Sequence, residues 1–334
     1  MNIILQAATY LDPTGMTQEQ IVETVGRTCY KSEDKITPES ADKFVASVVK
    51  NGHHAMIEFG FIYLKITDID FLEWFIATRP RWIRVVDEYA VGNFRAFYDW
   101  YNAWLNGEFM VEKDFFDQFM DLIWCLSHEH PIVFNDLYMK LCEKFDDYET
   151  DEEYYSGDVA YPFQVFERDA FIADFKQHNN LDILLKYLIP HIVKFTTNRA
   201  IAHELNRHRK HISYAMESTR YCDYSKDKFG NQITVIEPLF DPDSGKYGIW
   251  KELCERSEIA YFNLIQLKAK PEEARGVLPL DLKCDVWAAT YEDEWQWIIN
   301  LRMHEVTGHA HPQFKSLMQL IYPELCKHSE GRIK

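Results

Sequence analysis

The sequence predicts an α+β fold. Short apolar or alternating runs, which are typical of strands, occur among longer stretches whose apolar residues recur at helical spacing. The 334 residues are 47% hydrophobic, which is enough to bury a large core, and 13 Gly and 12 Pro are too few to mark a flexible linker. We therefore expect one domain over residues 1–334 with a large insertion, or one and a half domains.

The first 70 residues alternate between strand and helix patterns. Residues 3–10 are apolar and β-compatible, and residues 17–30 have helical spacing. A second helix should begin at Thr37-Pro38, where a capping hydroxyl precedes a proline at the first helical position, and should end at Asn51-Gly52. Large apolar residues alternate with small or polar ones over residues 59–69, which predicts a long strand with one buried face.

Helices should dominate from Phe71 to about Lys144. Residues 71–144 are rich in Trp, Phe and Tyr, which we interpret as core residues. The segment at about 102–164, which contains the acidic run 146–153, has the composition of a helical and acidic insertion in the main fold. One more strand is expected at 233–239. Further helices are predicted at 182–207, 255–268, 292–303 and 312–325.

The charge of the chain opposes some classes of partner. A formal charge of −17, from 53 acidic and 36 basic side chains, disfavours long-range attraction to nucleic acid or to an anionic membrane. The N-terminal residues have no basic leader and too short an apolar run for a signal peptide. No stretch approaches the about 18 apolar residues of a membrane span. We expect a cytoplasmic protein without nucleic-acid or membrane partners.

Neither thiol nor metal chemistry is indicated by the sequence. The seven cysteines are scattered, odd in number and without a CxxC pair, which is typical of reduced thiols in a core. His203, Glu204 and His208 resemble a zinc motif, but the histidines of that motif are four residues apart and these are five apart. His309 and His311 have no recognisable partner set. We expect no metal site.

The most unusual stretch is a basic run in this acidic chain. Residues 207–211 read Arg-His-Arg-Lys-His, and they lie where a helical pattern gives way to a loop. Arginine forks form bidentate hydrogen bonds with phosphate, so the run predicts an anion site; the alternative is a solvated helix face. Further donors suited to a nucleotide phosphate follow at Ser213, Ser218, Thr219 and Arg220.

These residues carry a family resemblance. The run RHRKHISYAMESTRY, residues 207–221, resembles the signature of flavin-dependent thymidylate synthases (the ThyX family), in which Arg-His-Arg is followed after seven residues by serine. Other stretches agree in the family's order, at residues 26–44, 52–66, 92–97, 274–279 and 299–314. The resemblance implies a ThyX-like fold, an antiparallel sheet flanked by helices, as a single domain with a helical insertion.

The resemblance implies which residues hold the cofactor and the nucleotide. Arg207, His208, Arg209 and Glu217 are expected to bind FAD. Arg302 should lie beside the pyrimidine of dUMP and favour ionisation of N3, so Arg302 and Ser218 are the expected catalytic residues. The expected dUMP-binding residues are Glu204, Arg207, Ser218, Thr219, Arg220, Arg275 and Arg302.

The resemblance also implies a reaction. NADPH reduces FAD, 5,10-methylenetetrahydrofolate gives its methylene to C5 of dUMP, and reduced flavin supplies the hydride that completes the methyl group of dTMP. No active-site cysteine is required. Family members are usually homotetramers in which several subunits build each active site, so we expect the same assembly here.

Three departures from the family pattern leave alternatives open. Eight residues instead of seven separate Arg209 from Ser218, and Phe59 stands where many members have histidine. Residues 291–293, Tyr-Glu-Asp, stand where the family often has Asn and Arg in contact with FAD. The alternatives are an enzyme that makes another 5-substituted pyrimidine nucleotide, such as a hydroxymethyl product, and a non-catalytic nucleotide-binding homologue.

Overall fold

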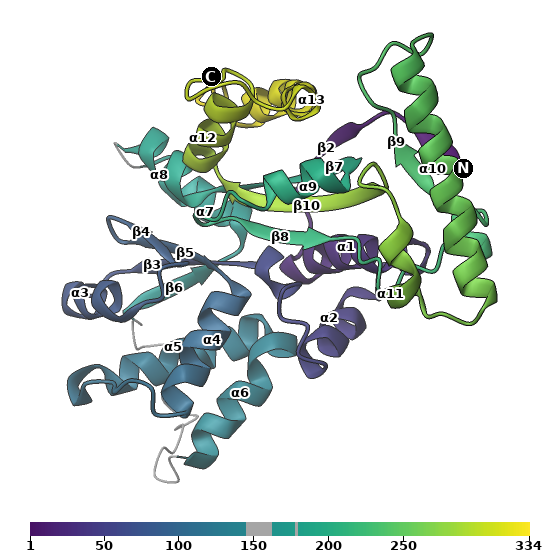
Figure 1. Cartoon of the computed structure of the whole chain (residues 1–334). Helices are drawn as coiled ribbons and strands as arrows, with labels where there is room; N and C mark the ends of the chain where they lie inside the picture. Colours follow the sequence, from purple (N-terminus) through teal and green to yellow (C-terminus); the bar gives the residue numbers. More distant parts are fainter. Residues whose placement is uncertain (145–161, 178–179) are drawn as a thin grey trace. The chain divides into compact units, whose positions relative to one another are not determined.

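The computed structural model describes residues 1–144, 162–177 and 180–334 (Figure 1). The chain divides into two compact units. We call Met1–Asp12, Thr24–Ile36 and Pro190–Lys334 the terminal unit, and Pro13–Glu23 with Thr37–Ile189 the middle unit. Helices and antiparallel sheets are both present, which confirms the α+β class. A single domain with an insertion at about 102–164 stays a prediction.

The terminal unit is built on a four-stranded antiparallel sheet. Its strand order is β2 (Ala7–Leu11), β7 (Pro190–Asn198), β10 (Lys283–Tyr291) and β8 (Ser213–Met216). β10 pairs with β7 along all nine residues, from Lys283 opposite Asn198 to Tyr291 opposite Pro190. The shorter β8 pairs with the middle of β10, Val286 to Ala289, and forms one edge of the sheet.

The two faces of this sheet differ in chemistry. Side chains alternate between faces along a strand, so Val193, Phe195 and Val286 point to one side and belong to a buried apolar core. Three helices cover that core side: α9 (Arg199–Leu205), α12 (Glu292–Arg302) and α13 (Pro312–His328) (Figure 1). Lys194 and Asp285 lie on the opposite face, where a polar cluster forms.

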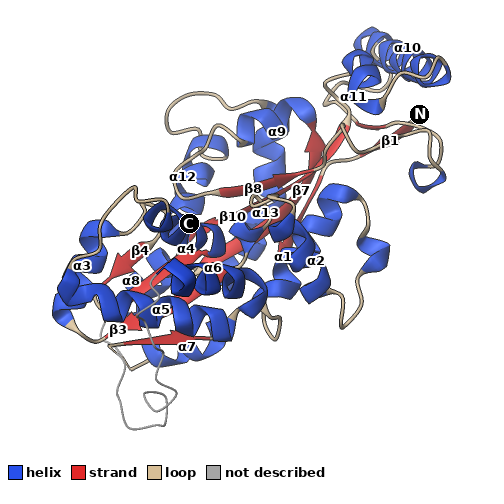
Figure 2. Cartoon of the chain, turned by 90° about the horizontal axis from the view of Figure 1, so that it is seen from below, coloured by secondary structure: helices blue, strands red, loops and turns tan. Residues whose placement is uncertain are grey.

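A smaller layer completes the terminal unit. Strand β1 (Asn2–Ile4) pairs in parallel with β9 (Thr234–Ile236), and the long helix α10 (Gly245–Gln266) packs near them (Figure 2). The second half of α1 (Gln18–Tyr30) also belongs to this unit. The remaining short helices of the unit are η1 (Glu33–Lys35), η5 (Asp227–Phe229), α11 (Pro271–Ala274) and η6 (Arg275–Val277).

The middle unit has its own antiparallel sheet and an aromatic core. The strand order is β4 (Arg84–Val86), β5 (Tyr89–Asn93), β3 (Phe61–Ile66) and β6 (Phe163–Phe166). Aromatic side chains pack closely, and the ring centroids of Trp100 and Phe119 are 5.2 Å apart. The helices are α2 (Ala41–Lys50), η2 (Ile57–Phe59), α3 (Ile69–Thr78), α4 (Phe94–Leu105), η3 (Lys113–Phe115), α5 (Phe116–Glu129), α6 (Pro131–Lys144), α7 (Arg168–Phe175) and α8 (Leu181–Leu188).

The prediction of one helix over residues 182–207 is wrong. The segment forms α8, then strand β7, then α9. Pro190 cannot donate the backbone hydrogen bond that a helix needs, and β-branched residues between Ile192 and Thr197 favour the strand. The strand fits because one of its faces is apolar and the other is polar.

Several other boundaries differ from the prediction. The helix expected at Thr37-Pro38 begins at Ala41, because residues 37–40 form a turn in which the Thr37 N–H bonds to the Ser40 hydroxyl. The helices expected throughout 71–144 are interrupted by the β4–β5 hairpin. The first strand region is two strands, β1 and β2, and α12 has nearly its predicted bounds. The acidic run 146–153 lies outside the described residues.

In the part of the chain that the structure describes, no helix is both long enough and apolar enough to cross a membrane.

Two tryptophans on α12 test how the helix is anchored. Trp295 is fully buried and its indole N–H donates to the His191 carbonyl at 3.1 Å, whereas Trp297 is 51% exposed. Trp295→Ala should lower the free energy of unfolding by about 3–5 kcal/mol, because it leaves a cavity in the core. Trp297→Ala is the matched control and should change it by about 0.5 kcal/mol or less. Urea denaturation measures both, and equal losses would contradict this packing.

Candidate active site

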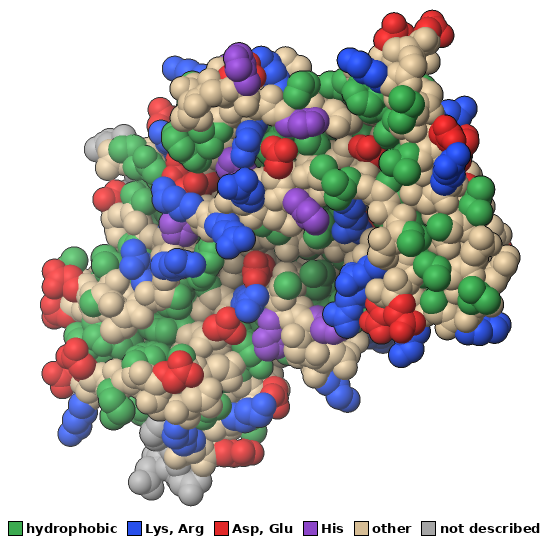
Figure 3. All heavy atoms as spheres, in the orientation of Figure 1, with side chains coloured by type: hydrophobic (Ala, Val, Ile, Leu, Met, Phe, Trp, Pro, Cys, Tyr) green, Lys and Arg blue, Asp and Glu red, His purple; other side chains and the backbone are tan. Residues whose placement is uncertain are grey.

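A basic cavity opens beside the C-terminal end of α9. Its volume is roughly 800 Å³, which is within the usual range for small-molecule sites. Lys and Arg side chains gather near α12 on the face drawn in Figure 3. We call this site the basic cavity; it is lined by Arg207, His208, Arg209, Lys210, Ile212, Asp293, Glu294, Trp297, Leu301 and Arg302.

The loop between α9 and β8 supplies half of the lining. The Asn198 side chain caps α9 by accepting from the Ile201 N–H, and the helix ends at Leu205. The loop then turns through His211, whose φ of 49° is in the left-handed region. The His211 carbonyl accepts a hydrogen bond from the Thr290 hydroxyl at 2.8 Å. The loop is therefore fastened to the end of β10.

Arg302 is held on three sides. Its Nε donates to Nε2 of His208 at 3.1 Å, and its guanidinium carbon lies 4.9 Å from the centre of the Phe314 ring. Nη1 lies 3.7 Å from a carboxylate oxygen of Glu204. The cation–π contact and the Nε hydrogen bond orient the guanidinium plane. With 24% of the side chain exposed, Arg302 can still contact a ligand in the cavity.

His208 is neutral at physiological pH. Burial, reinforced by the positive charges of Arg302 and Arg207, lowers its pKa to about 4. A neutral imidazole can accept the Arg302 N–H at Nε2, whereas an imidazolium cannot. The pair therefore keeps one positive charge, and that charge is on Arg302.

The remaining charges of the basic cavity are mixed. Glu294 is almost fully buried, and its carboxylate lies 3.0 Å from the Lys210 ammonium and 3.9 Å from Nδ1 of His211. Arg207 and Arg209 are exposed at the mouth. Cations dominate the lining although two acidic residues, Asp293 and Glu294, belong to it. The cavity therefore suits an anionic ligand.

A second group of predicted residues forms a turn after β8. In this Ser218 turn, residues 218–222, the backbone N–H groups of Tyr221 and Cys222 donate to the Ser218 carbonyl at 3.1 and 3.0 Å. The Ser218 hydroxyl accepts from the Arg220 N–H at 3.3 Å. A guanidinium nitrogen of Arg275 donates to the Thr219 hydroxyl at 3.4 Å. The Arg220 Nε lies 3.8 Å from Glu272.

The structure thus brings the predicted residues together in two groups. Glu204, Arg207, His208, Arg209 and Arg302 lie at the basic cavity, whereas Ser218, Thr219, Arg220 and Arg275 lie at the Ser218 turn. No residue of the turn lines the cavity. The four residues of β8 separate the groups, which corresponds to roughly 13 Å of strand.

Three other predicted or doubtful positions are buried. Glu217 is 2% exposed and faces lysines beneath the turn, and Phe59 is fully buried in the middle unit. Tyr291, at the end of β10, is 3% exposed. Among residues 1–144, 162–177 and 180–334, no group of three or more His, Cys, Asp or Glu side chains could hold a metal ion.

Sequence reasoning missed two features. Trp297 and Leu301 join Glu294 in the lining, and their spacing of three and four residues is the spacing of one helical face. That periodicity, combined with Arg302, could have identified them. Lys31 and Asp285, which surround Glu217, are 254 residues apart in sequence, and no local pattern connects them.

The titration of His208 tests the Arg302 geometry. Its NMR-detected midpoint should be near pH 4, and Arg302→Met should raise it because one of the charges that lower the pKa is removed. Between pH 6.5 and 4 the unfolded chain binds this proton and the folded chain does not, so the free energy of unfolding should fall as the pH falls through that window. A midpoint at 6.5 or above would contradict the assignment.

Comparisons with known proteins find similarity in the part of the chain that holds these residues. Residues 190–329, which include both groups of site residues, match the sequence model of the family described as thymidylate synthase complementing protein. A solved structure, the UMP/dUMP methylase PolB from Streptomyces cacaoi bound with 5-Br dUMP, is similar to the chain with a TM-score of 0.35 and 14% sequence identity, over 49% of this chain and 77% of that one. No curated protein sequence matches the chain. The match of residues 190–329 to the thymidylate synthase complementing protein model agrees with the resemblance of the sequence to flavin-dependent thymidylate synthases.

Proposed function

We propose that this protein is a flavin-dependent thymidylate synthase with a ThyX-like fold, which converts dUMP to dTMP with 5,10-methylenetetrahydrofolate and NADPH. The observation that carries the proposal is the placement of Arg302. The side chain is oriented by neutral His208 and by Phe314, and it lines the same basic cavity as Arg207 and Arg209. The family match over residues 190–329 supports it.

Arg302 is the proposed electrostatic catalyst. A fixed guanidinium beside the uracil ring stabilises negative charge as it develops at N3, and it requires no reorganisation during the reaction. His208 contributes by accepting the Nε hydrogen bond while carrying no charge that would compete for the ring. Glu204 lies close enough to Arg302 to contact the same nucleotide.

The donor set of the basic cavity fits FAD. Arg207, Arg209 and Lys210 offer guanidinium and ammonium groups that suit a diphosphate, and the carboxylate of Glu294 is already paired with Lys210. Trp297 adds an exposed ring to the lining, on which a planar group can stack. When bound, FAD supplies the hydride that completes the methyl group, after its reduction by NADPH.

The Ser218 turn is the proposed phosphate site for dUMP. The Ser218 hydroxyl accepts from the Arg220 backbone N–H, and the Thr219 hydroxyl accepts from the Arg275 guanidinium. Charge-assisted hydrogen bonds from arginine to phosphate are among the stronger polar contacts, at about 1.5–3 kcal/mol each. In this proposal the pyrimidine lies at Arg302 and the phosphate lies at the Ser218 turn. The nucleotide must therefore contact both groups, although no residue of the turn lines the basic cavity of the same chain.

We therefore propose a homotetramer in which the basic cavity of one copy and the Ser218 turn of another form one active site. The separation of the two groups by the length of β8 supports this arrangement. Folate and NADPH would bind as co-substrates at the same composite site.

The cysteines are consistent with a reaction that uses no thiol nucleophile. All seven are free, and burial raises the pKa of five of them, which keeps those thiols protonated. The five are Cys29, Cys125, Cys222, Cys254 and Cys284.

The test is tritium release from dUMP labelled at C5. The purified protein should be yellow and should release tritium when NADPH and methylenetetrahydrofolate are present, and mass spectrometry should identify dTMP. Arg302→Ala should retain FAD and lose about 100-fold or more of the turnover, because one preorganised charge at the reacting ring is removed. Arg256→Ala, on the exposed face of α10, is the control and should retain full activity.

Three outcomes would contradict the proposal. A colourless protein that releases no tritium would exclude the reaction. A hydroxymethyl product would replace dTMP synthesis with a related chemistry. Unchanged turnover in Arg302→Ala would remove the role assigned to that residue.

A further inference from the structure

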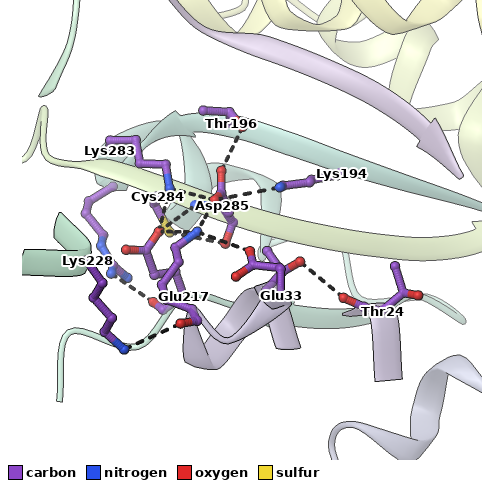
Figure 4. Close-up of polar contacts among 12 residues, drawn as sticks. Thr24, Glu33, Lys194, Thr196, Glu217, Lys228, Lys283, Cys284 and Asp285 are labelled. Carbon is purple, nitrogen blue, oxygen red and sulfur yellow. Dashed lines mark hydrogen bonds and ion pairs between the residues drawn. The ribbon is translucent and has the colours of Figure 1, made fainter. Parts of the chain in front are cut away.

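A buried ionic cluster lies beneath the Ser218 turn, on the polar face of the terminal sheet (Figure 4). Its two carboxylates, Glu217 and Asp285, are 2% and 5% exposed at their side chains. Three lysines surround them: Lys31 from the end of α1, Lys194 from β7 and Lys283 from β10. A buried charge is stable only where partners compensate the lost hydration. Removing one member of this cluster would therefore leave an uncompensated buried charge and destabilise the fold.

Glu217 uses its backbone and its side chain in this cluster. Its carboxylate lies 2.9 Å from the Lys283 ammonium and 3.4 Å from the Lys31 ammonium, and it accepts from the Asp285 N–H at 3.3 Å. The Glu217 backbone N–H donates to the Asp285 carbonyl at 2.9 Å, and the Glu217 carbonyl accepts from Arg199 at 2.8 Å. The residue that precedes Ser218 is therefore fixed at both ends of its backbone and at its side chain.

Asp285 holds the lysines in place. Its carboxylate is bonded to the Lys31 and Lys283 ammonium groups and accepts from the Thr196 hydroxyl at 2.7 Å. Lys194 lies 3.8 Å away. Burial alone would favour the protonated acid, but the charges of these lysines outweigh it and lower the pKa of Asp285 well below its usual range. Asp285 is therefore ionised across the physiological pH range.

The residues at the end of α1 also contact the region of the Ser218 turn. Lys31 has a φ of 51°, a strained left-handed conformation for a residue with a side chain, and this conformation places its ammonium beside Glu217 and Asp285. The preceding Tyr30 packs edge-on against Tyr221, with ring centroids 6.1 Å apart. Tyr30, the last residue of α1, and Lys31, which follows it, thus contact Tyr221 and Glu217, one on each side of Ser218.

We propose that Glu217 is a positioning residue, and that the buried cluster of Glu217, Lys31, Lys283 and Asp285 preorganises the Ser218 turn to receive the phosphate of a pyrimidine nucleotide. This inference rests on the proposed function, because that function supplies the nucleotide. Glu217 acts through the turn and touches no ligand in this role, in place of the flavin contact that the family resemblance implies.

The substitution Glu217→Gln separates positioning from simple electrostatics. It removes one negative charge near the proposed phosphate site, so a purely electrostatic role predicts tighter binding of dUMP. A positioning role predicts weaker binding, because the neutral amide cannot hold two ammonium groups and the turn is displaced. We expect the Kd of dUMP for the FAD-loaded protein, measured by calorimetry, to rise about tenfold or more. The Kd of FAD should be unchanged, since Glu217 does not line the basic cavity.

Glu258→Gln on α10 is the matched control. The Glu258 carboxylate also accepts from a backbone N–H, that of Ile233 at 3.0 Å, and pairs with an ammonium group, that of Met1 at 2.9 Å. The variant should lose stability by the same mechanism and leave the Kd of dUMP unchanged. Equal weakening in both variants would show a general loss of folding instead of positioning, and would overturn the inference.

A measurement on the unsubstituted protein covers the case in which Glu217→Gln does not fold. Hydrogen exchange at the Glu217, Tyr221 and Cys222 amides should already be slow in the FAD-loaded protein without nucleotide. Protection that appears only when dUMP is added would overturn the preorganisation. If the unsubstituted protein does not bind dUMP, both the proposed function and this inference are contradicted. If the unsubstituted protein binds dUMP and the Glu217→Gln variant binds it equally well or more tightly, only this inference is contradicted.

Discussion

The pairing of edge strand β8 with β10 determines where the functional groups of this chain lie. Four residues of β8 are fixed opposite Val286 to Ala289, so the loop before the strand and the turn after it emerge at opposite ends. The loop lines the basic cavity with α12, and the turn lies above the buried ionic cluster. One short strand therefore separates the proposed flavin and pyrimidine contacts from the proposed phosphate contacts.

Charged side chains have different roles at the two ends of β8. At the basic cavity Arg302 donates to an uncharged imidazole and lies against an aromatic ring, and its charged partner is the Glu204 carboxylate, 3.7 Å from Nη1. At the turn the buried carboxylates and lysines satisfy one another, and the ligand-facing groups are separate arginines and hydroxyls. In the proposed function, charged side chains contact the ligand directly at the basic cavity, whereas the buried charges at the turn hold the backbone.

Part of this arrangement could be predicted from the sequence. The Arg-His-Arg run and Arg302 were expected to meet because of their resemblance to a family signature, and the structure places them in one cavity. Periodicity alone would not have joined them, since they lie on different elements. The sequence pattern predicts a helix at β7, because this segment runs between two helical segments without a break in apolar character. Only the β-branched residues and Pro190 indicate the strand.

The ionic cluster could not be predicted from the sequence, for a different reason. Lys31 follows α1, Glu217 lies between β8 and the Ser218 turn, and Asp285 belongs to β10. Only the tertiary fold brings the three side chains together. The resemblance implies a flavin contact for Glu217, which lies within the signature, whereas its burial among lysines is a property of the tertiary fold. Long-range charge pairing leaves no periodic trace in a single sequence.

The central claim, that one active site combines the basic cavity of one copy with the Ser218 turn of another, is tested most directly by mixing two inactive proteins. Arg302→Ala disables the cavity, and the double variant Ser218→Ala with Arg220→Ala disables the turn. Coexpressed, the two chains should form mixed assemblies in which some sites combine two intact groups, and tritium release from C5-labelled dUMP should return although each variant alone is inactive. A coexpressed mixture that is assembled and remains as inactive as its components would contradict the claim.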